Sequence, residues 1–181
     1  MLAVVAQWTG KEQVHANCVV PILVSSEQGH LKSTFCKGLL HPCLHRYYTE
    51  KFSLTSQGDA ERKLAEMALI NLAEFDRYSL VQMPQLKNLM QLSTLNLRKP
   101  HQKSYRLLPR IASFIGTSNR MDLLTDPSGS RRYICIEVKQ AINLEGIEHS
   151  QIYAQLKAEL MADRRYFFNK EEEQQIQQHN L

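Results

Sequence analysis

The segment SSEQGHLKST, residues 25–34, holds residue types that bind phosphate groups. In a phosphate-binding loop, backbone N–H groups surround the anion, a Lys neutralises its charge, and a Ser or Thr hydroxyl ligates magnesium. Lys32 and Ser33 supply the side chains for the last two tasks, with Gly29 and Thr34 beside them. This segment therefore predicts a nucleotide-binding loop in which Ser33 is a magnesium ligand.

Two glycines that such a loop normally contains are missing. Ser26 and Leu31 stand at their positions. A left-handed backbone at Leu31 would cost roughly 1 to 2 kcal/mol, which a folded domain can bear. The alternative is that Ser33 or Thr34 simply begins a helix behind a surface Lys.

Polar residues also follow two further apolar runs. The second run ends in INLAEFD, with Glu74 and Asp76, and the third ends in FIGTSN, with Asn119. An NTPase uses one acid in this place to hold magnesium and another to polarise the attacking water. Because Ala73 stands where a metal-orienting Asp is usual, Asp76 either substitutes for that Asp or caps the following turn. An Asn after a strand is, by itself, a common turn residue.

A basic segment, NLRKPHQKSYRLLPR, separates the second and third runs. It contains Arg98, Lys99, His101, Lys103, Tyr105, Arg106 and Arg110. Such a segment predicts contact with a nucleic-acid backbone through charge neutralisation, with Tyr105 offering a stacking surface. The alternative is a solvated basic loop.

Four potential metal ligands lie close together in the sequence: Cys36, His41, Cys43 and His45. Their spacing matches no zinc pattern, and Pro42 marks an ordinary loop after a helix, so we do not predict a zinc site. The four cysteines of the chain also lack the paired spacing of a disulfide framework, which favours a reducing cytoplasm.

The elements that must position these residues follow from the apolar pattern. Buried strands are predicted at residues 18–25, 68–75, 110–119 and 131–138, a strand and turn at 47–59, and helices at 32–40, 60–67, 83–92 and 149–181. This alternation predicts an α/β fold whose central sheet is mostly parallel and flanked by helices. Ligands bind beyond the carboxyl ends of such strands, where the phosphate loop, Glu74 and Asn119 would meet.

Length and composition suit one domain. The chain has 181 residues and a net charge of +4, which is only weak evidence for a polyanionic partner. No stretch is long and apolar enough to cross a membrane, and the N-terminus lacks the basic lead of a signal peptide. Its apolar residues have no N-cap signal before them, so we expect residues 1–181 to be a single-domain fragment of a longer protein.

Five segments resemble the virulence-associated protein E family: LVSSEQGHLKSTF, LINLAEFD, LPRIASFIGTSN, LLTDPSGSRRYICIEV and YAQLKAEL. Proteins of this family are P-loop proteins of phages, plasmids and genomic islands. They are related to the AAA+-like superfamily 3 helicases and are often fused to a primase. The resemblance implies a P-loop NTPase fold, ATP and Mg²⁺ as cofactors, single-stranded DNA as a partner, and a homo-oligomer in the full-length protein.

The resemblance also assigns roles to residues. Lys32 and Ser33 match the phosphate-binding Lys and the magnesium Ser, Glu74 matches the catalytic Glu, and Asn119 matches the Asn that senses the γ-phosphate. The basic segment corresponds to a hairpin that grips single-stranded DNA in superfamily 3 helicases.

The GSRR block adds Arg131 and Arg132, which match an Arg pair of the family. The resemblance implies that one of the two is an arginine finger toward a neighbouring subunit. The alternative is a surface ion pair with Asp122 or Asp126, which would add little stability.

The sequence thus predicts a DNA-dependent ATPase, helicase-like, acting in replication of a mobile genetic element. Its rival is a catalytically silent module that keeps the fold as a DNA-binding or assembly platform, which the departures at Ser26, Leu31 and Ala73 favour. A small-molecule P-loop kinase would need a basic lid, and the sequence shows none.

Overall fold

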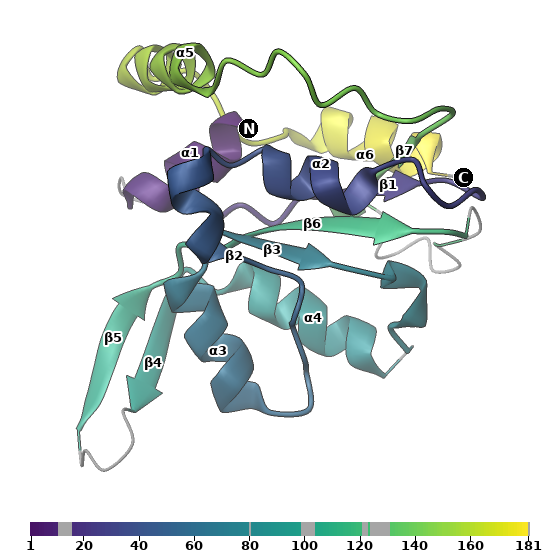
Figure 1. Cartoon of the computed structure of the whole chain (residues 1–181). Helices are drawn as coiled ribbons and strands as arrows, with labels where there is room; N and C mark the ends of the chain where they lie inside the picture. Colours follow the sequence, from purple (N-terminus) through teal and green to yellow (C-terminus); the bar gives the residue numbers. More distant parts are fainter. Residues whose placement is uncertain (11–15, 80, 99–103, 121–122, 124–130, 181) are drawn as a thin grey trace.

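A computed structural model describes residues 1–10, 16–79, 81–98, 104–120, 123 and 131–180. Its centre is a parallel sheet of five strands in the order β2-β3-β6-β1-β7 (Figure 1). The strands are β1 (Val20–Val24), β2 (Tyr48–Thr49), β3 (Leu69–Leu72), β6 (Ser113–Ser118) and β7 (Tyr133–Glu137). The prediction of an α/β fold with a mostly parallel sheet is confirmed.

The strand order places β6 between β1 and β3. Ile22 of β1 pairs with Gly116 of β6, and Leu72 of β3 pairs with the same Gly116. A Cβ built on Gly116 would lie 3.3 Å from the Ile22 side chain, so this position favours the smallest residue. The three strands that precede the predicted functional residues are therefore neighbours in register.

Helices cover both faces of the sheet (Figure 1). They are α1 (Leu2–Thr9), α2 (Lys32–Gly38), α3 (Gln57–Glu66), α4 (Gln82–Gln91), α5 (His149–Met161) and α6 (Lys170–His179), with 3₁₀ turns η1 (Pro42–Tyr47) and η2 (Phe75–Arg77). The larger core lies under α3 and α4 and includes Ile70, Leu72 and Phe114. The smaller core lies under α2 and includes Leu23 and Cys36. Among the helices that the structure describes, none is long and apolar enough to cross a membrane.

The free edge of β7 is capped by Asn180, just after α6. The Asn180 side chain accepts a hydrogen bond from the Cys135 N–H and donates one to the Tyr133 carbonyl. These contacts satisfy backbone groups that an unpaired edge strand would expose. The predicted helical tail at 149–181 is correct for α5 and α6, which residues 162–169 separate without helix.

The basic segment forms an antiparallel hairpin of β4 (Thr94–Arg98) and β5 (Tyr105–Pro109), with Arg98 opposite Tyr105. The hairpin extends away from the body of the domain, on the side opposite the tips of the β3 and β6 arrows (Figure 1). The family resemblance implied a hairpin here, whereas the residue pattern alone suggested only a basic segment. All of β5 is exposed, and Leu95 anchors β4 in the larger core.

Arg110 does not belong with the exposed cations of the basic segment, although the sequence pattern suggested that it did. Its side chain is fully buried and donates to the carbonyls of Leu92, Ala112 and Asn17. A guanidinium held in this way cannot reach a nucleic-acid backbone. Arg110 ties the base of the hairpin to the segment before β1, so its role is structural.

Candidate functional site

The carboxyl ends of β1, β3 and β6 surround a cavity of about 500 Å³. Its walls are residues 28–34 after β1, residues 73–74 after β3, and residues 117–119 at the end of β6. Ligand pockets of proteins typically enclose about 300–1,000 Å³, so a small molecule fits. The parallel sheet thus brings Gly29, Lys32, Ser33, Thr34, Glu74 and Asn119 together, as the sequence predicted.

Lys32 lies at the centre of this arrangement. Its Nζ donates to Asn119 Oδ1 at 2.9 Å, and it lies 3.4 Å from the Ser25 carbonyl and 3.5 Å from the Glu27 carbonyl. Partial burial lowers the pKa of the Lys32 ammonium from its ordinary value. Among the described residues, only neutral oxygens contact the Lys32 ammonium. No carboxylate there neutralises its positive charge, so the charge can interact with an anion that enters the cavity.

The loop before α2 is held by His30. The His30 Nδ1 atom lies 2.8 Å from Ser25 Oγ and 3.1 Å from the Val138 carbonyl, which follows β7. Ser25 Oγ also accepts from the Glu27 N–H at 3.1 Å, and His30 Nε2 lies 3.3 Å from Glu27 Oε2. The loop is therefore fixed at both of its ends and to the neighbouring strand.

The backbone at Leu31 is left-handed, with φ 59° and ψ 24°. This conformation costs an L-residue about 1–2 kcal/mol, and glycine normally avoids that cost. Gly29, two residues earlier, also has a positive φ of 86°. The loop therefore keeps a turn that favours glycine at position 31, although the sequence supplies Leu there.

Glu74 is left-handed as well, with φ 53° and ψ 51°, and directly follows the short segment after β3. Glu74 is one of the residues that line the cavity, and its Oε2 lies 2.6 Å from Arg77 Nη1 in an exposed ion pair. Asp76 points elsewhere, because its Oδ1 accepts from Ser118 Oγ at 2.8 Å and it does not line the cavity. Asp76 therefore connects η2 to the end of β6.

Arg131 and Arg132 precede β7 in the chain, at the amino edge of the parallel sheet. Arg131 Nη1 lies 3.7 Å from Glu173 Oε2 of α6. Since the cavity is at the carboxyl edge, this pair lies at the opposite edge of its own domain. Neither Asp122 nor Asp126, the alternative partners, lies within the described residues.

The predicted DNA-binding residues are only partly described. Arg106 is exposed on β5, and Tyr105 beside it is 61% exposed. The backbone of Arg98 belongs to β4, whereas Lys99 and Lys103 lie outside the described residues.

The sequence reading missed four polar residues of the site: Ser25, His30, Thr117 and Ser118. Ser25, Thr117 and Ser118 are buried, so they resemble ordinary small residues in an apolar run. Their polar chemistry at a strand end was the signal that could have identified them. His30 gave no such signal, since its bond to the Val138 carbonyl joins residues 108 positions apart.

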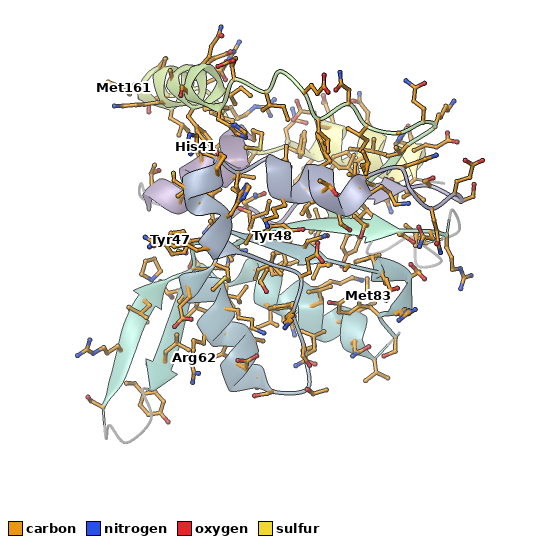
Figure 2. The ribbon with its side chains drawn as sticks, viewed as in Figure 1. His41, Tyr47, Tyr48, Arg62, Met83 and Met161 are labelled. Atoms are coloured by element: carbon orange, nitrogen blue, oxygen red, sulfur yellow. The ribbon has the colours of Figure 1, made fainter. Side chains whose placement is uncertain are left out.

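The Cys and His residues in and after α2 form no metal site in the described part of the chain. His41 Nδ1 lies 3.0 Å from Cys43 Sγ. The His41 ring, labelled below α5 in Figure 2, meets the ring of His149, the first residue of α5, edge-on. Cys36 is fully buried, and burial raises the pKa of its thiol to about 12. These side chains pack and cap the turn that joins α2 to β2.

The family model for the virulence-associated protein E-like domain matches residues 6–181. The chain belongs to this family. No curated protein matches it in sequence.

Solved structures share the fold of this virulence-associated protein E-like domain. The apo C-terminal region of NrS-1 (305–718) matches with a TM-score of 0.57 and 16% identity, over 99% of this chain and 38% of that one. Its A form matches with a TM-score of 0.53 and 16% identity, over 99% and 37%. The chain thus spans less than two-fifths of the NrS-1 C-terminal region, and at this level of identity the similarity shows a shared fold only.

Proposed function

We propose that this domain is a P-loop NTPase that binds ATP with Mg²⁺ in the cytoplasm and couples hydrolysis to movement on single-stranded DNA during replication of a mobile genetic element. The observation that carries the proposal is the contact between Lys32 and Asn119 beside Glu74, around one cavity at the carboxyl edge of the sheet. A cation, an acid and an amide from three neighbouring strands form the set that phosphoryl-transfer sites use.

The donor types fit a magnesium nucleotide. Lys32 and the N–H groups around Leu31 would hold the phosphates, and Ser33 would hold Mg²⁺ through its hydroxyl. Bound magnesium would neutralise charge on the phosphate oxygens. Glu74 would orient and activate water, and Asn119 would exchange its bond to Lys32 for one to the γ-phosphate.

The hairpin supports the DNA part of the proposal. Arg106 and Tyr105 are exposed on β5 and present a cation and an aromatic ring to solvent. Cations neutralise phosphates and aromatic rings stack on unpaired bases, in a manner that tolerates any sequence. In a homo-oligomer, one Arg of the 131–132 pair would reach the site of a neighbouring subunit, since it lies at the far edge of its own.

The rival is a domain that keeps this fold as a DNA-binding or assembly platform without hydrolysis. Ala73 favours it, because no carboxylate stands immediately before Glu74. Leu31 does not, because the backbone there already has the left-handed geometry that a glycine would supply.

Nucleotide binding tests the proposal first. Titration of the chain with a fluorescent ATP analogue and Mg²⁺ should show saturable binding that Lys32→Ala weakens at least about tenfold, since a charge-assisted contact to phosphate contributes more than 1.4 kcal/mol. Lys37→Ala is the matched control, because Lys37 lies exposed on the same helix and does not line the cavity.

Hydrolysis separates the proposal from its rival. The full-length product of the gene should hydrolyse ATP faster when single-stranded DNA is added. Glu74→Gln in that protein should abolish ATP turnover while nucleotide binding persists. Equal binding by the wild type and Lys32→Ala would overturn nucleotide binding at this cavity. Binding without any hydrolysis would establish the platform instead.

A further inference from the structure

A second cavity, of about 640 Å³, lies at the amino edge of the parallel sheet. Its walls come from α1, η1, the end of α3 and the residues that lead into β2, β3 and β6. The candidate phosphate site is formed by residues that follow the strands, so the two cavities lie at opposite edges of the sheet. We call the second cavity the amino-edge pocket. Its volume falls within the range of about 300–1,000 Å³ that is typical of ligand sites.

Two aromatic side chains line the amino-edge pocket, Trp8 and Tyr47. The Trp8 Nε1 atom donates to the Ala68 carbonyl at 2.9 Å, which fixes the indole beside the start of β3. The Arg46 guanidinium lies over the Tyr47 ring, with Cζ 4.7 Å from the ring centroid. Arg46 is exposed and both rings are half-buried, so all three groups can contact a molecule that enters. Aromatic rings and guanidinium planes are the surfaces on which proteins stack unpaired bases.

The charges on the wall favour an uncharged part of a ligand. Arg46 and Glu66 both line the pocket, and in the described part of the chain neither forms an ion pair. One positive and one negative charge leave the wall neutral, and Leu44, Met67 and Ile111 make much of it apolar. A nucleobase, which is planar and uncharged, suits such a wall better than a phosphate does. The exposed Arg46 then remains available to the phosphate attached to that base.

The pocket adjoins the base of the β4-β5 hairpin. Ile111, which lines the pocket, comes just after β5, and its N–H donates to the Leu64 carbonyl of α3 at 3.1 Å. Figure 2 shows Tyr47 near the end of the β5 arrow. All of β5 is exposed. A single strand of DNA that lies along β5 therefore reaches the amino-edge pocket at the base of the hairpin.

We propose that the amino-edge pocket holds one unpaired base of the single-stranded DNA that the hairpin binds, with Trp8 and Tyr47 contacting the base and Arg46 contacting its phosphate. This inference rests on the DNA part of the proposed function and adds a base-binding site to it. It also supplies a cation at the base of the hairpin, where Arg110 is fully buried and cannot contact DNA.

The fluorescence of Trp8, the only tryptophan of the chain, tests this site. The probe is a single-stranded deoxycytidine oligomer of about ten nucleotides, a length within the site sizes of single-strand binding folds. It is titrated into the chain without ATP. A base in the pocket contacts the indole, so we expect saturable quenching of Trp8. An abasic oligomer with the same sugar-phosphate backbone should bind more weakly and leave the Trp8 fluorescence unchanged.

Four variants make the result specific. Tyr47→Ala should weaken binding of the deoxycytidine oligomer by about 5–100-fold, the contribution of one stacked base, whereas Tyr47→Phe keeps the ring and should bind like the wild type. Arg46→Gln changes only an exposed side chain and should weaken binding by a smaller factor. Lys157→Gln is its matched control, because it also removes one exposed cation, on α5, that does not line the pocket. Its affinity should equal that of the wild type.

The outcomes separate this inference from the proposed function. If the wild type does not bind the oligomer, both the DNA part of the proposed function and this inference are overturned. Binding that is seen in the anisotropy of a labelled oligomer but leaves Trp8 unquenched would overturn this inference alone, as would equal quenching by the abasic oligomer. Equal quenching by free deoxycytidine monophosphate, at the same concentration of nucleotide, would show a site for free nucleotides and would also overturn it.

Discussion

Arg110 and Arg106 lie four positions apart in the basic segment, and their replacement by Met should have opposite consequences. Arg110 is fully buried, whereas Arg106 is exposed on the hairpin. Burial lowers the pKa of Arg110 to about 10, so its guanidinium is still charged at neutral pH. A charge in this position is tolerated only because its donors are used.

The magnitude follows from the contacts of Arg110. Nε donates to the Leu92 carbonyl at 2.6 Å, and Nη1 and Nη2 donate to the carbonyls of Ala112 and Asn17 at 3.0 Å each. At the lower end of about 1.5–3 kcal/mol for a hydrogen bond to a charged group, three bonds amount to about 4–5 kcal/mol. Met fills part of the volume and removes the cost of a buried charge, so we expect a loss of about 3–5 kcal/mol in the free energy of unfolding.

Equilibrium unfolding in urea measures this loss. The only tryptophan of the chain, Trp8, adjoins Gln7, whose Oε1 lies 3.4 Å from Arg110 Nη2, so its fluorescence reports on this region. Arg106→Met should change the free energy of unfolding by less than about 0.5 kcal/mol. A loss below about 1 kcal/mol for Arg110→Met, or weaker DNA binding by a fully folded Arg110→Met protein, would refute the structural assignment of Arg110.

Three further changes have signs that the structure fixes. Tyr133→Phe removes a buried hydroxyl that has no partner among the described residues, so stability at pH 7 should be kept or rise by about 1 kcal/mol in urea titrations. Burial raises the Tyr133 pKa from 10.0 to about 12, so the folded protein keeps a proton that the unfolded chain loses between pH 10 and 12. Stability should therefore fall as the pH rises through this window, and fall less in Tyr133→Phe. Arg106→Ala should weaken binding to labelled single-stranded DNA and lower the slope of log affinity against log salt by about 1, whereas an unchanged slope would exclude a phosphate contact. Leu31→Gly relieves a left-handed conformation and should raise the free energy of unfolding, measured in urea, by up to about 1 kcal/mol. A lower free energy of unfolding would show instead that the contacts of the Leu31 side chain stabilise the protein more than the backbone conformation destabilises it.

The apolar runs were sufficient to predict the sheet and the edge at which the site lies. β1, β3 and β6 are buried on both faces, so each contains apolar residues with few charged ones, and the polar residues that follow each strand stand out. Parallel pairing then requires Lys32, Glu74 and Asn119 to meet. The local pattern was sufficient because charged residues are absent from all three strands.

The remaining features depend on contacts between distant residues. Arg110 looks like its basic neighbours, and its burial is decided by Asn17, 93 positions away. Trp8 stands in an unremarkable apolar stretch, and its orientation is decided by Ala68, 60 positions away. Asp76 turns toward Ser118 because a left-handed residue precedes the 3₁₀ turn that carries it. No spacing rule predicts pairs of this kind.

The backbone conformations of Leu31 and Glu74 connect the fold to its chemistry. Three described residues other than glycine have a positive φ, and two of them, Leu31 and Glu74, line the same cavity. Each costs about 1–2 kcal/mol, which a domain of ordinary stability keeps only where the surroundings enforce it. At Leu31 the turn starts α2 so that Lys32 meets Asn119, and at Glu74 it redirects the chain from β3 into η2. Strain of this kind concentrates at functional sites. Two strained turns on neighbouring strand ends, facing one cavity, therefore support the proposal that a ligand binds there, even though two glycines of the usual loop are absent.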